Sequence, residues 1–348
     1  MIFKRNKNSR LDTAIGLDLG ARQIKAAVLR RREGKLCLSD YLIKSAVKRN
    51  GAEQYATSLQ DVVAKLTAAD RSVRVTVSCP SAMICQTEFP YVPLKDVKAA
   101  LQINSVVYLR RDFSNYCLDA FELADPSAEP NGKKPTKMNV IVGGASREDV
   151  TWYRNALTTA KLRPTVMELA AMSVVNAFQF CHPDLCENEV LLVLDIGAHS
   201  TSINFLLRGQ PVMTRITQFG GDLVSEYVAQ VLTLQPEAAE EEKLKMSDTV
   251  QPLIRQSISP LVQEIRSSID YFERQHECHV TRLFACGGSA CSNRMLEFLS
   301  EEIGLHIEAW NPVATLDTSH FNGETPQLMA VAPSLAAAIG AAVTHLQG

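Results

Sequence analysis

One pattern occurs twice in this chain and constrains its fold more than any other feature. Residues 15–30 read IGLDLGARQIKAAVLR, and residues 192–208 read LVLDIGAHSTSINFLLR. With one extra residue in the second copy, both align as an apolar strand, Asp-x-Gly-Ala, a turn and a second strand. Each copy therefore predicts a β-hairpin that turns at Asp-x-Gly. Two copies about half the chain apart predict that each hairpin opens its own mixed α/β sheet.

Length, charge and cysteine pattern exclude several classes of protein. The chain has 348 residues, with 36 Lys and Arg against 38 Asp and Glu, so its formal charge is −2. That balance gives no global positive field, and we expect no nucleic-acid partner. We find no apolar run near 18 residues and no apolar stretch after the N-terminal charges, so we expect a cytoplasmic protein. The nine cysteines form no Cys-x-x-Cys pair, which argues against a disulfide framework or a zinc ribbon.

The segments around the hairpins predict further elements. Residues 81–164 have an α+β pattern, which we interpret as a subdomain inserted into the first half. Its strands are expected at 83–89, 116–123 and 138–143, and its helices at 94–109 and 149–161. A stretch rich in Pro, Gly and Lys over residues 124–137 predicts a surface loop. Later helices are predicted over 222–234, 236–246, 259–275 and 332–346, with a strand at 283–285.

An Asp-x-Gly hairpin can hold phosphate by a definite mechanism. Glycine lets the backbone turn tightly, so successive amide N–H groups point into one concavity that attracts anions. The Asp can meet a hydrated Mg²⁺ ion on those phosphates. One such hairpin is also compatible with a plain turn, but two that face each other can clamp a nucleotide from both sides. Gly287-Gly288 lies between an apolar strand and a helix, which is typical of a nucleotide turn or of a simple strand-to-helix turn.

The ordered motifs resemble the actin-like ATPase superfamily, and more closely the PilM proteins of type IV pilus assembly, with FtsA a more distant relative. The resemblance covers almost the whole chain and rests on IGLDLG, MELAAMSVVNAF, VLDIGAHSTSINFLLRGQPVMTRITQFGGDLV, EAAEEEKLK, FACGGSA, Asn311-Pro312 and APSLAAAIGAA. It implies two duplicated, ribonuclease H-like α/β domains with a nucleotide cleft between them. The implied subdomains are IA (1–80, 165–190 and 333–348), IC (81–164), IIA (191–235 and 280–332) and IIB (236–279).

The same resemblance implies ATP and Mg²⁺ as ligands and assigns the site residues by position. Asp18 and Asp195 are the implied metal-binding and catalytic acids, with the metal held through water. Glu168 falls where the first connecting helix carries an acid that positions the attacking water. The implied nucleotide-binding residues are Gly20, Ala21, Arg22, Gln23, Lys25, Gly197, His199, Ser200, Thr201, Gly220, Gly221, Glu240, Lys243, Gly287, Gly288 and Ser289.

The first hairpin departs from the family pattern. Relatives usually read Gly-Ser/Thr-Ser/Thr where this chain has Gly20-Ala21-Arg22-Gln23, so hydroxyls that help to bind phosphate are missing. Arg22 either substitutes as a phosphate ligand or blocks the site. The IC helix that often reads E-x-E-x-Y-I-P in the family reads QINSVVYLRRD here, which changes the expected partner surface.

The resemblance implies a cytoplasmic ATP-binding scaffold of a type IV pilus or type II secretion-like assembly platform, peripheral at the inner membrane face and attached there only through partners. The implied partner is the cytoplasmic N-terminal segment of a PilN-like inner-membrane protein, bound in a groove between IA and IC. Nucleotide would act as a clamp or slow switch with slow or absent hydrolysis, and a homo-oligomer is compatible with the sequence. Two alternatives stay open: a small-molecule kinase of the same fold, and an FtsA-like filament-forming protein.

Overall fold

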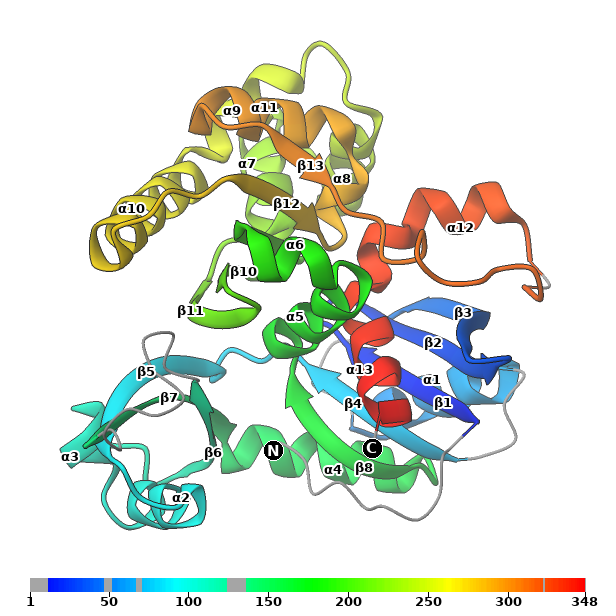
Figure 1. Ribbon diagram of the computed structural model, residues 1–348. Helices are drawn as coiled ribbons and strands as arrows, with labels where there is room; N and C mark the ends of the chain where they lie inside the picture. Colours follow the sequence, from blue (N-terminus) through cyan, green and yellow to red (C-terminus); the bar gives the residue numbers. More distant parts are fainter. Residues whose placement is uncertain (1–11, 47–51, 67–70, 124–135, 322, 348) are drawn as a thin grey trace.

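Each Asp-x-Gly hairpin forms the centre of a five-stranded sheet, and the two sheets have the same strand order. The computed structural model describes residues 12–46, 52–66, 71–123, 136–321 and 323–347 (Figure 1). The first sheet has the order β3 (Lys35–Ser45), β2 (Gln23–Arg32), β1 (Thr13–Leu19), β4 (Ser72–Val77) and β8 (Arg163–Leu169). The second has the order β11 (Gln210–Thr217), β10 (Thr201–Leu207), β9 (Val190–Ile196), β12 (Arg282–Cys286) and β13 (Ile307–Ala309).

The pairing within the two sheets also repeats. In each, three successive strands form an antiparallel meander, a later strand pairs in parallel with the first strand of the meander, and a further strand pairs in parallel with that one. Helices cover both faces of each sheet, and a strand that is buried on both faces reads as a continuous apolar run. This explains why β1 and β9 lack the polar alternation of a half-exposed strand. The predicted duplicated α/β fold is confirmed.

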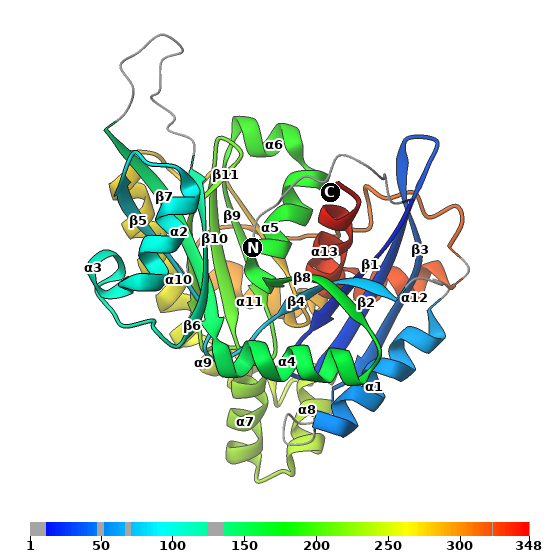
Figure 2. The same ribbon diagram turned by 90° about the horizontal axis from the view of Figure 1, so that it is seen from below.

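Two helices lie between the sheets and join the halves (Figures 1 and 2). These are α5 (Ala170–Cys181) and α13 (Ala336–Gln347). They approach each other so closely that a Cβ at Gly340 would lie 1.9 Å from the backbone oxygen of Ser173. Small residues at these positions therefore allow the backbones to touch, as the Ala- and Gly-rich C-terminal sequence predicts.

The outer faces are covered by the remaining helices. On the first sheet, α1 (Ala52–Lys65) packs beside α4 (Arg147–Thr159), as Figure 2 shows. On the second sheet, the covering helices are α7 (Gly221–Leu232), α9 (Gln251–Ser257), α10 (Ser259–His276) and α11 (Asn293–Ile303), with α8 (Pro236–Lys245) packed on α7. The helices predicted over 222–234, 236–246 and 259–275 are confirmed to within two residues at each end.

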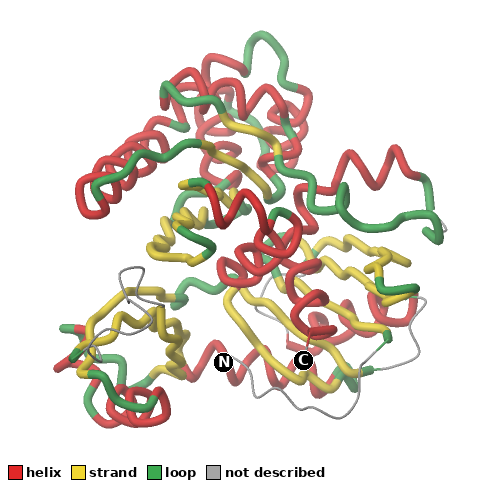
Figure 3. Tube along the Cα trace, in the orientation of Figure 1, coloured by secondary structure: helices red, strands yellow, loops and turns green. Residues whose placement is uncertain are grey.

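The inserted α+β segment forms a third, smaller sheet (Figure 3). Its order is β5 (Met83–Pro90), β7 (Lys137–Ser146) and β6 (Tyr116–Leu123), and α2 (Leu94–Ile103) packs on one face. The helix predicted over 94–109 is wrong as a single helix, because non-helical backbone at Asn104 separates α2 from α3 (Ser105–Leu109). The buried Ser105 hydroxyl bonds to the backbone beyond α3, which fixes this break.

The helix α4 lies within the segment 81–164 that we assigned to the inserted subdomain. Its buried Tyr153, Ala156 and Leu157, however, pack with α1 and the first sheet rather than with the three-stranded sheet. The subdomain boundaries remain a prediction, but by packing α4 belongs with the first half. The loop predicted over 124–137 falls almost wholly outside the described residues.

The end of the described chain runs through α12 (Thr325–Val331), a 3-10 turn (Ala332–Leu335) and α13. This helical stretch of 23 residues is long and apolar enough to cross a membrane by length and composition, so our expectation of no such run was wrong. However, 78% of its most apolar window is buried inside the protein. It is therefore a core helix whose apolar side chains pack on the first sheet and on α5.

Candidate functional site

A cleft of about 830 Å³ lies between the two halves, and both hairpin turns line it. It brings together residues that are far apart in the sequence: the first hairpin, the second hairpin, α7, α8 and the turn after β12. The predicted site residues that line it are Asp18, Gly20, Ala21, Arg22, Gln23, Lys25, Asp195, Gly197, His199, Ser200, Gly221, Glu240, Lys243, Gly287, Gly288 and Ser289.

The two hairpin turns have the same hydrogen bond. The amide of Gly20 donates to the carbonyl of Gln23 at 3.1 Å, and the amide of Gly197 donates to that of Ser200 at 3.0 Å. A Cβ at either glycine would lie 2.9 Å from the accepting carbonyl oxygen, so a side chain would open the turn. The sequence repeat therefore encodes two matching tight turns that bound the cleft.

Three charged side chains form the centre of the cleft. The ammonium of Lys25 lies 3.0 Å from Oδ2 of Asp18, and the two residues are paired across β1 and β2. Burial lowers the pKa of Lys25, but the carboxylates of Asp18 and Asp195 outweigh it and raise that pKa. Burial raises the pKa of Asp195 to about 6, with Lys25 opposing and Asp18 adding to the shift. One lysine thus faces two carboxylates, so the centre of the cleft carries net negative charge when both are ionised.

The turn after β12 closes against this centre. Gly287 has a φ of +91°, and a Cβ there would lie 2.6 Å from Oδ1 of Asp195. Only glycine combines this backbone conformation with such a close approach. The predicted Gly-Gly turn therefore brings its backbone directly beside the second acidic side chain.

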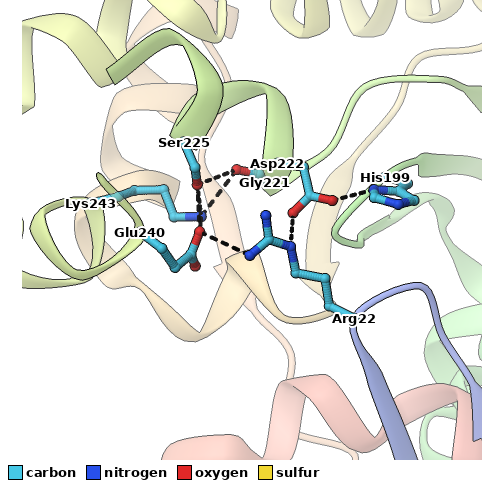
Figure 4. Close-up of polar contacts among 7 residues, drawn as sticks. All are labelled: Arg22, His199, Gly221, Asp222, Ser225, Glu240 and Lys243. Atoms are coloured by element: carbon cyan, nitrogen blue, oxygen red, sulfur yellow. Dashed lines mark hydrogen bonds and ion pairs between the residues drawn. The ribbon is translucent and has the colours of Figure 1, made fainter. Parts of the chain in front are cut away.

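A hydrogen-bonded group joins α7 to α8 at the other end of the cleft (Figure 4). The ammonium of Lys243 donates to the carbonyl of Gly221 at 3.0 Å, to Oγ of Ser225 at 2.8 Å and to Glu240 at 2.8 Å. All three of its N–H donors are thus used within the protein. Burial raises the pKa of Glu240, but hydrogen bonds from Lys243 and Ser225 outweigh it and lower that pKa. These residues hold the cleft wall in shape.

Arg22 reaches across the cleft from the first hairpin to this wall (Figure 4). Its Nε donates to Asp222 at the start of α7, and its NH1 lies 3.7 Å from Glu240. Asp222 also contacts Nδ1 of His199 in the second hairpin turn. Arg22 is therefore held by carboxylates of the other half.

Three predicted site residues do not line the cleft. Thr201 is buried and donates to the carbonyl of Phe219, so its hydroxyl supports the hairpin from behind. Gly220 packs against the second turn, where a Cβ would lie 2.3 Å from the carbonyl oxygen of Ala198. Both residues shape the site without facing it.

Glu168 is the third, and its predicted place on a connecting helix is wrong. It lies in β8, the strand before α5, where it pairs with Thr76 across the parallel ladder. Its carboxylate lies 3.5 Å from the buried guanidinium of Arg74, and burial raises its pKa in spite of that partner. Glu168 is therefore paired inside the first half and is not among the residues that line the cleft, although Leu169 beside it is.

Several cleft residues were missed by the sequence reasoning. Asp222 directly follows the predicted Gly220-Gly221 pair, and its place in the first turn of a helix was a usable signal. Others, such as Cys291, Met295 and Ser334, lie in helices and turns with no polar pattern that would single them out.

Known proteins resemble this chain in family pattern and in overall fold. A family model described as Type IV pilus assembly protein PilM matches residues 16–346. A solved structure described as a PilM-PilN type IV pilus biogenesis complex has a TM-score of 0.86 and 24% identity, covering 97% of this chain and 99% of that chain. Ethanolamine utilization protein EutJ from Carboxydothermus hydrogenoformans has a TM-score of 0.53 and 15% identity, covering 98% and 92%. MreB5 of Spiroplasma citri bound to ADP has a TM-score of 0.51 and 11% identity, covering 97% and 98%. The structural likenesses establish an actin-like fold.

Proposed function

Because the chain belongs to the PilM family of type IV pilus assembly proteins, we propose that it is a nucleotide-binding scaffold of such an assembly platform. The observation that carries the nucleotide proposal is the cleft, in which two matching glycine turns and two acidic side chains from separate halves face one space. Turns of this kind present backbone amides to phosphate. We propose ATP with Mg²⁺ as the ligand.

The residues in the cleft fit a magnesium nucleotide. Oδ1 of Asp18 is buried and has no hydrogen-bond partner among the described residues, so it is an acceptor in need of a cation or a water molecule. Within the described part of the chain, no group of three or more His, Cys, Asp and Glu side chains is arranged to hold a metal. Asp18 and Asp195 would therefore hold Mg²⁺ through water, and the ion would neutralise phosphate charge.

The chain's own residues would bind and orient the nucleotide. Lys25 contacts Asp18 and lies in the field of Asp195, and it would supply a cation for phosphate, while the backbone at Gly287 and Gly288 would approach the remainder of the ligand. Glu240 and Lys243 would shape the pocket for ribose and base, since their hydrogen bonds are made within the protein. Because Glu168 lies outside the cleft, we propose that hydrolysis is slow or absent and that nucleotide acts as a clamp.

We further propose that the partner is a PilN-like inner-membrane protein, bound through its cytoplasmic N-terminal segment between the first half and the inserted subdomain. The junction there is held by Ser81, whose hydroxyl contacts Asp149 and accepts from the amide of Ser146 at 3.0 Å. A fixed junction would offer a preformed groove to an extended segment. This arrangement would place the protein at the cytoplasmic face of the inner membrane. The family match supports a pilus assembly protein and gives no support to the small-molecule kinase or the filament-forming protein.

The nucleotide proposal is tested by ligand-dependent thermal stability. Wild type, Asp195→Asn and the control Asp184→Asn, which changes an exposed acid outside the cleft, are heated with and without ATP·Mg²⁺. Ligand at about 100 times its Kd adds about 2.7 kcal/mol of stability, and we expect that increment in wild type and the control only. Equal increments in all three proteins, or none in wild type, would contradict the proposal.

The partner proposal is tested by titrating the protein with the N-terminal cytoplasmic peptide of the PilN-like protein from the same organism. We expect saturable binding by calorimetry. Substitution of Ser81 by a bulky residue at the junction should weaken it, and the control Arg32→Ala, on an exposed part of β2, should not. If the Ser81 substitution leaves the affinity for the peptide unchanged, the partner binds elsewhere.

A further inference from the structure

Arg22 makes contacts that its place in the first hairpin does not predict. Arg22 belongs to the first hairpin, yet its guanidinium pairs with Asp222 on α7 and lies 3.7 Å from Glu240 on α8 (Figure 4). Both acceptors belong to the second half. The side chain therefore spans the cleft and connects one half of the protein to the other.

The two acceptors are fixed before the arginine reaches them. The Asp222 side chain is only 8% exposed, and its backbone amide donates to the carbonyl of Ala198 at 2.9 Å. Glu240 is held by the hydroxyl of Ser225 and by Lys243 at 2.8 Å. The Arg22 side chain is 47% exposed. The carboxylates of Asp222 and Glu240 are thus held in place, and the more exposed Arg22 side chain extends to them from the first hairpin turn.

We propose that Arg22, Asp222 and Glu240 form an ionic latch that holds the two halves together when no nucleotide is bound. We call this group the Arg22 latch. The proposal rests on the proposed function, because the cleft that the latch spans is the one assigned to nucleotide. In this proposal nucleotide enters through a form in which the halves are further apart, so the latch slows association by lowering the population of that form.

The chemistry of the side chain suits this role. A planar guanidinium can contact two carboxylates at once through different N–H groups, whereas a lysine ammonium is a point charge. Because the pair is partly exposed, its contribution is modest and is reduced by salt. An ion pair of this class changes an equilibrium by about two- to five-fold. The latch therefore adjusts the rate of nucleotide exchange without locking the cleft.

A phosphate-ligand role for Arg22 makes the opposite kinetic prediction. An arginine that contacts bound phosphate stabilises the complex, so its removal speeds dissociation and leaves association unchanged. A latch that restrains the free protein slows association, so its removal speeds association. The two roles are therefore separated by which rate constant changes.

The test is stopped-flow binding of a fluorescent ATP analogue with Mg²⁺ to wild type, Arg22→Ala and Arg22→Lys. The control is Arg32→Ala, which removes an exposed arginine from the far end of β2. We expect Arg22→Ala to raise the association rate constant about two- to five-fold at low salt, with most of the gain lost at about 0.5 M NaCl. Arg22→Lys should show part of the gain, and the control none. An unchanged association rate with faster dissociation would overturn the latch.

A second measurement tests the latch without nucleotide, so that its failure can be distinguished from failure of the nucleotide proposal. Hydrogen exchange of the nucleotide-free proteins is followed by mass spectrometry at residues 18–23, 197–200 and 220–223, which line or adjoin the cleft. We expect two- to five-fold faster exchange in Arg22→Ala than in wild type or Arg32→Ala. If no protein binds nucleotide but this difference is present, the nucleotide proposal fails and the latch stands. If exchange is identical, the latch is overturned whether or not nucleotide binds.

Discussion

A neutral side chain at position 195 is expected to stabilise the protein in the absence of metal and nucleotide. Burial raises the pKa of Asp195 from 3.8 to about 6, and the neighbouring Asp18 adds to the shift while Lys25 opposes it. A raised pKa means that the fold favours the protonated form. The stabilisation is complete below pH 3.8 and is lost as the pH rises through about 6.

The size of the effect follows from the shift. At 1.36 kcal/mol per pKa unit, a shift of about two units corresponds to about 3 kcal/mol at neutral pH. Asp195 is partly reached by water in the cleft, so we expect Asp195→Asn to be more stable than wild type by about 1–3 kcal/mol at pH 7–8. The two proteins should approach equal stability toward pH 4.

The assay is urea unfolding in EDTA at several pH values between 4.5 and 8, with midpoints compared at equal slope. Asp18→Asn provides the contrast, because Asp18 is ion-paired with Lys25 at 3.0 Å and its neutralisation should destabilise the protein. Addition of Mg²⁺ should narrow the gap between wild type and Asp195→Asn. A variant at position 195 that is less stable than wild type at pH 8, or a difference independent of pH, would refute the reasoning.

Three further predictions concern stability. Lys25→Met leaves Asp18 without its cation and should cost about 3 kcal/mol at pH 7, measured by urea unfolding, and no loss would mean that water already reaches the pair. Gly340→Ala should cost more than about 3 kcal/mol in a thermal melt, because its Cβ would lie 1.9 Å from the Ser173 carbonyl oxygen, and a melt like wild type would show that α5 and α13 can separate freely. Ser292→Ala removes the side-chain cap of α11 and should lower the free energy of unfolding by about 1 kcal/mol, measured with urea. The control Ser292→Thr keeps a capping hydroxyl and should unfold like wild type, and an equal loss in both variants would contradict the capping role.

The repeated hairpins show how far local sequence determines the site. Asp18 and Asp195 could be placed in matching turns because Asp-x-Gly with flanking apolar strands specifies the turn, the strands and the position of the acid together. Most of the cleft residues named from these motifs do line it. The local sequence pattern was therefore sufficient to place a side chain wherever one hairpin turn determines its position.

Prediction failed where a distant partner decides the outcome. The strand β8 was missed because Arg163–Leu169 has neither alternation nor a long apolar run, and it pairs only because β4 lies alongside. The helix break at Asn104 depends on bonds that Ser105 makes to later backbone. Likewise, the contact of Arg22 with α7 joins segments about two hundred positions apart, and no local pattern specifies such a contact.

The place of α13 in the fold has a consequence for how the protein is made. The helix is the last element of the described chain, yet it covers one face of β1 and β2, which are synthesised long before it. Because synthesis proceeds at about 5–20 residues per second, α13 is made tens of seconds after the β1–β2 hairpin on which it packs. The segment from β9 to β13 is contiguous and contains its own core, so it can fold during that interval. Cotranslational folding is therefore expected to run from the second half to the first, against the order of synthesis.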